Sequence, residues 1–166
     1  MSHPPHQPRQ HRELRHLLHG RRTAALGSIN ADGTPMVSMV PYAIEFSAPC
    51  LVIHVSSLAA HTGNLLRQPL VSLLVMAPEM PGEPVHALPR ATLQGRAQAP
   101  TPDSPGWHTA RASYLARFPE AAAMMELGDF RLVRILIDQI RQIAGFGAAR
   151  TVDTLEIAQL LAAPQD

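Results

Sequence analysis

Five polar residues lie close together where an apolar run gives way to a helical pattern. They are Ser56, Ser57, His61, Thr62 and Asn64. A helix N-terminus offers unpaired N–H groups and a partial positive charge, and neighbouring hydroxyl groups add further donors. The spacing therefore indicates a cradle for a phosphate or another anion. The alternative is a structural role, in which Ser56 or Ser57 caps the first turn of the helix.

The histidines of the chain are weaker candidates for catalysis or metal binding. His61 is a possible base, but no Ser–His–Asp or Cys–His pattern accompanies it. His16 and His19 are three residues apart on a predicted helix with Glu13 on the same side, yet no complete set of metal ligands goes with them. We therefore expect no metal site and no hydrolase chemistry.

Arg90 and Arg96 are six residues apart on a predicted strand, so their side chains point to the same face of the sheet. If that face lines a pocket, the two guanidinium groups bind an anion. If it does not, they belong to a solvated surface. Asp129 precedes a strand that carries Arg131 and Arg134, and it is an ion-pair partner for either of them.

The elements that would position these residues follow from changes in hydrophobic period. Strands are predicted over residues 23–30, 35–45, 51–55, 70–76, 90–97, 130–137 and 139–144. Helices are predicted over residues 12–20, 56–68, 104–119, 120–127 and 153–161. The Asp32-Gly33 pair is a strong hairpin signal. An antiparallel sheet of about six strands loses its open edges most economically by closing, so the pattern predicts a small β-barrel with helices outside it.

The chain divides into three predicted parts. Residues 1–12, with three prolines and three histidines, are expected to form a mobile N-terminal arm. Residues 13–152 are expected to form the barrel domain, and residues 153–166 a C-terminal helix and tail.

Composition excludes several classes of protein. All 14 basic residues are arginine, and the absence of lysine excludes Schiff-base chemistry and Walker-type phosphate binding. Aromatic content of 4% disfavours nucleic-acid binding, and no apolar stretch is long enough for a membrane span. The single cysteine, Cys50, excludes an intramolecular disulfide. We expect a cytoplasmic domain that binds a small molecule.

The order of several segments resembles a known family. TAALGSIN, ADGTP and MVSMVPYA are followed by SSLAAHTGNLLRQPLVSLLV, RATLQGRAQ, DFRLVRI and AGFGAA. This order, over about residues 12–152, resembles the FMN-binding split-barrel superfamily. The likeness is greatest to the haem-utilisation (HugZ/HutZ-like) branch of the pyridoxamine 5′-phosphate oxidase-related proteins.

The resemblance implies a mainly β fold with α-helices (α+β), a six-stranded antiparallel split β-barrel with peripheral helices. It also implies a homodimer with ligand sites at the subunit interface. In the flavin-binding members, the residues matching Ser38, Met39 and Val40 border the flavin ring. Its phosphate would be surrounded by Ser56 or Ser57, His61, Thr62 and Asn64.

Two departures from the family pattern concern the cofactor. Pyridoxamine phosphate oxidases clamp the phosphate with an Arg-Lys pair, where this chain has Leu58 and Ala59. Arg22, Arg67 or Arg90 is a candidate replacement for that charge. Haem-degrading members use an axial histidine near the C-terminus, whereas the last histidine here is His108. His86 and the histidines of the arm are the substitutes that the sequence offers.

The primary hypothesis is an FMN-binding protein, a flavin-dependent oxidoreductase acting on an unidentified small molecule. In this hypothesis the protein holds and tunes the flavin, and no protein nucleophile is needed. The alternative is a haem-binding or haem-degrading protein of the same fold. A third possibility is a dimeric binding protein that uses no cofactor.

Overall fold

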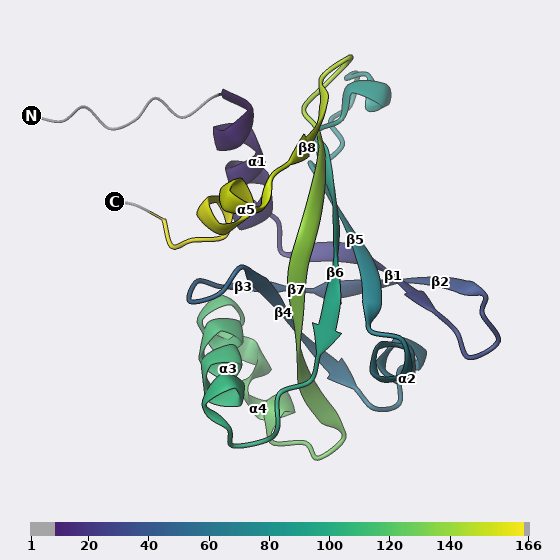
Figure 1. The fold of residues 1–166 in the computed structure, drawn as a ribbon, viewed down its shortest axis with the longest axis vertical. Helices are drawn as coiled ribbons and strands as arrows, with labels where there is room; N and C mark the ends of the chain where they lie inside the picture. The colour runs from purple at the N-terminus through teal and green to yellow at the C-terminus, as the bar shows by residue number, and fades with distance from the viewer. Residues whose placement is uncertain (1–8, 165–166) are drawn as a thin grey trace, which may run out of the picture.

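The computed structural model describes residues 9–164, in which eight strands form one antiparallel sheet that curls into a barrel (Figure 1). The strands are β1 (Thr23–Ile29), β2 (Pro35–Pro41), β3 (Ala43–Glu45), β4 (Cys50–Ser56), β5 (Leu70–Met76), β6 (Arg90–Gln98), β7 (Phe130–Ile143) and β8 (Ala149–Val152). The α-helices are α1 (Arg9–Gly20), α2 (Ala60–Arg67), α3 (Pro105–Arg117), α4 (Ala122–Met125) and α5 (Thr154–Leu160). Short 3₁₀ turns are η1 (Val85–Ala87) and η2 (Pro119–Ala121).

One bent segment brings the two ends of the sheet together. The strand order is β2-β1-β5-β6-β7-β4-β3, yet β2 and β3 follow each other in the chain through Tyr42. The segment pairs with β1 before the bend and with β4 after it. The bend after Pro41 therefore divides the single predicted strand 35–45 in two. The predicted α+β split barrel is confirmed, with eight strands rather than six.

The longest strand, β7, replaces two predicted strands. Residues 130–137 and 139–144 were expected to be separate, but β7 runs through Asp138 without a break. The register with β6 shifts between Gln94 and Gly95, so Asp138 is the extra residue of a β-bulge. β8 was not predicted, because its four residues give too short a pattern. It pairs with β7 after the bend at residues 145–147.

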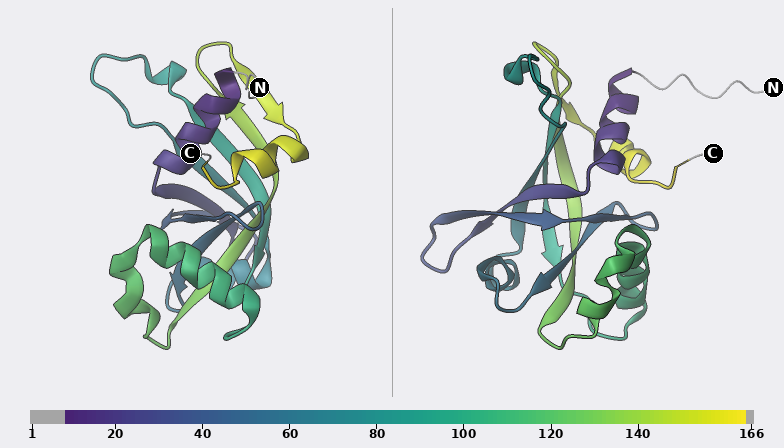
Figure 2. Two further views of the ribbon diagram at one scale, coloured as in Figure 1. Left: turned by 90° about the vertical axis from the view of Figure 1, so that its left-hand side faces the viewer. Right: turned by 180° about the vertical axis from the view of Figure 1, so that it is seen from behind.

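α1 with α5 and α3 with α4 cover two regions of the barrel, and α2 packs separately against β1 and β6 (Figure 2). α1 and α5 lie together and contribute Leu14, Leu18, Ile157 and Leu160 to the core inside the sheet. α3 packs outside β3, β4 and β7, and its Tyr114 is buried in a second, smaller apolar cluster. Within residues 9–164, no helix is long and apolar enough to cross a membrane.

The first helix begins earlier than predicted. Residues 9–12 were assigned to the arm, but they form the first turn of α1, and the side chain of His11 is buried. The other residues of the predicted arm, 1–8, lie outside the described part of the chain. At the other end of the sequence, the predicted helix 153–161 is observed as α5, capped by the Asp153 side chain, which accepts a bond from the backbone N–H of Glu156 at 2.8 Å.

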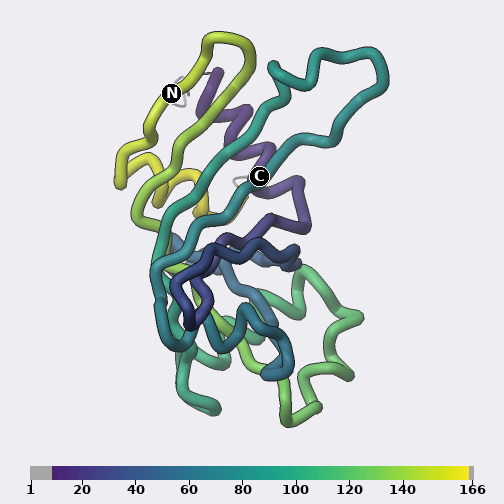
Figure 3. The backbone as a smooth tube through the Cα atoms, turned by 90° about the vertical axis from the view of Figure 1, so that its right-hand side faces the viewer, coloured from purple at the N-terminus to yellow at the C-terminus, as the bar shows by residue number. Residues whose placement is uncertain are grey.

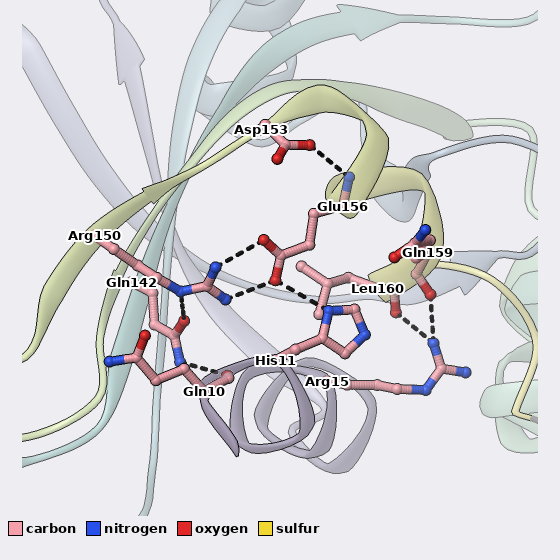
Figure 4. Close-up of polar contacts among 9 residues, drawn as sticks. All are labelled: Gln10, His11, Arg15, Gln142, Arg150, Asp153, Glu156, Gln159 and Leu160. Carbon is pink, nitrogen blue, oxygen red and sulfur yellow. Dashed lines mark hydrogen bonds and ion pairs between the residues drawn. The ribbon is translucent and has the colours of Figure 1, made fainter. Parts of the chain in front are cut away.

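A network of polar side chains joins α1 to α5 and to the sheet (Figure 4). His11 Nδ1 lies 3.0 Å from Glu156 Oε1, and Arg150 donates two bonds of 2.7 Å to the same carboxylate. Arg15 donates to four backbone carbonyl groups at the end of α5, those of Gln159, Leu160, Ala162 and Ala163. These bonds fix the position of α1 against the end of the barrel.

Candidate ligand site

The predicted anion cradle lies at the junction of β4 and α2, but three of its five side chains bond to other groups of the protein. The Ser56 hydroxyl donates to Asp129 Oδ2 at 3.1 Å and accepts from the Leu58 N–H. The buried Thr62 hydroxyl donates to the Ser56 carbonyl at 2.5 Å. α2 starts at Ala60, four residues later than predicted, and its N-cap residue Ala59 makes no side-chain cap bond.

Asn64 is turned away from the start of the helix. Its buried amide nitrogen donates to Ser28 Oγ at 3.1 Å and to Asn30 Oδ1 at 2.9 Å, and its oxygen accepts from Arg67 at 2.8 Å. Asn64 therefore ties α2 to β1. Of the five predicted cradle residues, only Ser57 and His61 have side chains with no hydrogen-bond partner among residues 9–164. Partial burial lowers the pKa of His61, which keeps its imidazole neutral near pH 7.

The three residues predicted to border a flavin ring lie on two different faces of β2. Met39 is 66% exposed on the outer face of the sheet. Ser38 and Val40 point to the opposite face, as the alternation of a strand requires. The Ser38 hydroxyl is buried and has no hydrogen-bond partner among residues 9–164.

Arg90 is not close to the cradle. In the β5–β6 ladder Arg90 pairs with Met76, whereas Leu70, which follows α2, pairs with Arg96 at the other end. One Arg90 nitrogen donates to the Leu88 carbonyl at 2.9 Å. The structure therefore places Arg90 and the five cradle residues at opposite ends of the same strand pair.

A pocket that sequence reasoning missed lies between α1 and the ends of β5, β6 and β7. Figure 3 shows α1 running beside the loop that joins β5 to β6 and beside the end of β7. The pocket has a volume of about 540 Å³. Its walls are Arg9, Glu13, Leu14, His16, Leu17, Gly20 and Arg21 on the helical side, and Ala77, Pro78, Pro89, Gln142, Ile143 and Ala144 opposite.

The helical wall of this pocket has a recognisable spacing. Arg9, Glu13, His16 and Gly20 recur every three or four residues, which places them on one face of α1. This spacing also makes His16 and Glu13 candidate metal ligands in the sequence. His19, the other residue of that hypothesis, differs from His16, because its Nε2 lies 2.7 Å from the Leu160 carbonyl and its ring stacks on Phe46.

The charge in the pocket is carried by Arg21. Arg9 and Glu13 neutralise each other through a contact of 2.6 Å between Nε and Oε1. Arg21 Nε is buried and has no hydrogen-bond partner among residues 9–164. An unpaired buried donor is costly unless a ligand or water satisfies it, so this nitrogen marks a place for an acceptor.

A second hollow, on the outer face of the sheet, adjoins this pocket. The two share Arg21, Ala77 and Pro78. The second hollow continues over Met39, Leu74 and Met76 of the outer face. Arg21 therefore lies where the groove beside α1 meets the second hollow, whose lining also includes the carboxylate of Glu79.

A curled antiparallel sheet with helices packed around it is the arrangement of the split-barrel class. Residues 10–144 match the family model described as pyridoxamine 5′-phosphate oxidase, and the chain belongs to that family. It is 30% identical over 141 residues to "Heme oxygenase HutZ" of Vibrio cholerae, a match that covers 84% of this chain and 79% of that protein.

Solved structures give the same relationship. A heme-binding protein from Mycobacterium smegmatis superposes with a TM-score of 0.79 at 26% identity, covering 92% of this chain. The chain spans 61% of the mycobacterial protein's length. HutZ of Vibrio cholerae, described there as a heme storage protein, superposes with a TM-score of 0.68 at 28% identity, covering 78% of this chain and 89% of that one. The resemblance to the haem-utilisation branch is confirmed.

Proposed function

We propose that the protein binds haem and takes part in haem storage or breakdown. The observation that carries this proposal is the match to HutZ, which extends over most of both chains and recurs in the structural comparison. The alternative hypothesis of the sequence analysis is therefore better supported than its primary one.

The residues present fit haem. Haem presents a flat apolar macrocycle, two carboxylates and an iron that takes a nitrogen, sulfur or oxygen ligand. The pocket beside α1 has apolar walls that include Leu17 and Ile143, and it contains a histidine. Its unpaired buried Arg21 Nε is a donor for a carboxylate. Bound haem would supply an iron centre at which oxygen chemistry takes place.

The flavin hypothesis has less support from the side chains. The Thr62 hydroxyl and the Asn64 amide, both predicted to hold the FMN phosphate, bond to Ser56, Ser28 and Asn30 instead. Leu58 and Ala59 occupy the places of the family's Arg-Lys pair. A phosphate at α2 would therefore lack the charge-assisted contacts of that pair.

Parallel titrations with haemin and FMN test the proposal. The purified protein is desalted after each addition, and its absorption spectrum is recorded. We expect a retained Soret band that saturates at a fixed ratio of haem to chain, and no retained flavin band. Retained FMN without a Soret band would overturn the proposal in favour of the flavin hypothesis. In the haem-loaded sample, ascorbate in air with catalase distinguishes storage, with a stable spectrum, from breakdown, with a decaying one.

We also propose that a second copy of the chain covers the outer face of the sheet. Met39, Ala25 and Leu74 lie side by side across β2, β1 and β5, and their side chains share this face. Val37 and Met39 are 71% and 66% exposed, and Leu70 and Met76 are also exposed on it. Apolar side chains gathered on one face of a sheet are typical of an interface rather than of a free surface.

A further inference from the structure

The geometry points to His16 as the axial ligand of the haem iron and to Arg21 as the partner of a haem carboxylate, both in the pocket between α1 and the ends of β5, β6 and β7. This inference rests on the proposed haem binding and assigns its site.

His16 differs from the other histidines in what surrounds it. Of the seven histidines among residues 9–164, it alone lines this pocket. It is exposed on α1, and within the described part of the chain it forms no hydrogen bond or ion pair. A nitrogen lone pair on its imidazole is therefore available for a metal ion without breaking any existing contact.

The remaining histidines are engaged or lie elsewhere. His11 is buried against Glu156, and His19 bonds to the Leu160 carbonyl. The half-buried ring of His54 stacks on Phe130, with centroids 4.9 Å apart. His61, His86 and His108 lie on α2, η1 and α3, outside the lining of this pocket.

The walls suit a flat apolar ligand with an anionic edge. Opposite α1, the groove is formed by the apolar residues Ala77, Pro78, Pro89, Ile143 and Ala144 and by the polar Gln142, none of which carries a charge. On the helical side the charges of Arg9 and Glu13 cancel each other, so Arg21 gives the groove a net positive charge. An anionic group that approaches Arg21 would satisfy its buried Nε.

The position of Arg21 also fixes how the ligand would lie. Since the groove and the outer-face hollow meet at Arg21, a ligand carboxylate paired with Arg21 would lie at this junction. The junction borders the face that we propose to be covered by a second chain. The haem would then be enclosed partly by α1 and partly by the subunit contact.

The first experiment tests the iron ligand. Haemin is titrated into the wild-type protein, His16→Ala and the matched control His108→Ala, which removes another exposed histidine from a helix. For His16→Ala we expect a shifted or lost Soret band and a Kd at least tenfold higher, whereas His108→Ala is unchanged. Added imidazole should restore the wild-type Soret position in His16→Ala, because it supplies the missing ligand. Circular dichroism and thermal unfolding of the unliganded variants check that the fold is intact.

The second experiment tests the carboxylate partner. Arg21→Met is compared with Arg22→Met, which removes the neighbouring exposed guanidinium. We expect Arg21→Met to weaken haemin binding about tenfold without moving the Soret band, which corresponds to the loss of one charge-assisted contact. Haemin dimethyl ester, which lacks the charged carboxylates, should bind both variants and the wild type equally well.

The outcomes separate this inference from the proposed function. If the wild-type protein retains no haem, the proposed function itself is wrong. If it retains haem and His16→Ala keeps the wild-type spectrum, the function stands and the assignment of His16 is overturned. Loss of the spectrum in His86→Ala or in a His3→Ala/His6→Ala double variant, with His16→Ala unaffected, would place the iron ligand elsewhere. An equal effect of Arg21→Met on haemin and on its ester would overturn the role of Arg21.

Discussion

Glu45 is a fully buried carboxylate whose charge is balanced by a residue from another strand. It ends β3, and both of its oxygens accept bonds from Arg134 on β7. Burial raises the pKa of Glu45, but the bonds from Arg134 and Ser47 lower it by more, so the net pKa lies below the usual value of 4.5. Glu45 therefore stays ionised in the folded protein and depends on Arg134 to do so.

Removing Arg134 should destabilise the protein in a pH-dependent way. In the wild type, the stability contributed by Glu45 is present above pH 4.5 and is lost as the pH falls through its lower folded-state pKa. In Arg134→Met the buried carboxylate loses its cation, so its folded-state pKa rises above the unfolded value. We expect a loss of about 3–5 kcal/mol at pH 7 and a smaller loss at pH 4.

Urea denaturation at pH 7 and pH 4 measures this effect. Arg131→Met is the matched control, because Arg131 lies on the same strand and is exposed. Its stability should stay within about 0.5 kcal/mol of the wild type at both pH values. A difference between Arg134→Met and the wild type that does not change with pH would contradict the argument.

Among the elements, the β6–β7 pair depends on one glycine. A Cβ atom added to Gly95 would clash with the Leu136 carbonyl oxygen, which belongs to the backbone and cannot rotate away. Gly95 adjoins the bulge where the β6–β7 register shifts. Only glycine allows the two strands to approach so closely at this point.

We expect Gly95→Ala to destabilise the protein by about 1–3 kcal/mol, since the strands must separate to admit the methyl group. Gly63→Ala is the contrasting variant: Gly63 lies inside α2, and a Cβ there meets nothing within 4 Å. It should raise stability by up to about 1 kcal/mol, because alanine is the better helix former. Thermal unfolding of both variants measures the two effects. Equal melting temperatures would show that the close contact at Gly95 relaxes at little cost.

At this scale the sequence predicts well those features that depend on a few neighbouring residues. The Asp32-Gly33 turn joins β1 to β2, and the predicted cap Ser104 accepts the Trp107 N–H at the start of α3. In each case the signal and the structure lie within a few residues. The fold class followed from the order of such segments, together with the family resemblance.

What could not be predicted depends on contacts between distant residues. Nothing near Asn64 in the sequence shows that its amide turns inward to Ser28 on β1, so the cradle hypothesis counted a structural residue as a ligand. The pocket beside α1 joins residues 9–21 to residues 77–89 and 142–144. Its helical wall has a readable spacing, but the opposite wall is brought there only by the curl of the sheet.

At the scale of the whole molecule, the exposed apolar row on the outer face of the sheet leads us to expect a dimer. Met39→Glu places a charge in the centre of the exposed apolar row across β2, β1 and β5. We expect sedimentation analysis to give about twice the mass of the 18.0 kDa chain for the wild type and the mass of a single chain for Met39→Glu.

Leu58→Glu is the control for this substitution. Leu58 is 87% exposed, but it lies at the turn between β4 and α2, away from the outer face. The Leu58→Glu protein should sediment like the wild type. If Met39→Glu sediments in the same way, the dimer does not use this face.

The contact between α1 and α5 has a consequence for how the chain folds as it is synthesised. α1 is made before any strand, yet Arg15 finds its four carbonyl partners only after α5 has left the ribosome. A nascent chain that has reached β8 therefore has every strand of the barrel and the contacts of α1 with the sheet, but it lacks the four bonds from Arg15 to the end of α5. The helix that carries His16 therefore gains its full support only after α5 has been synthesised.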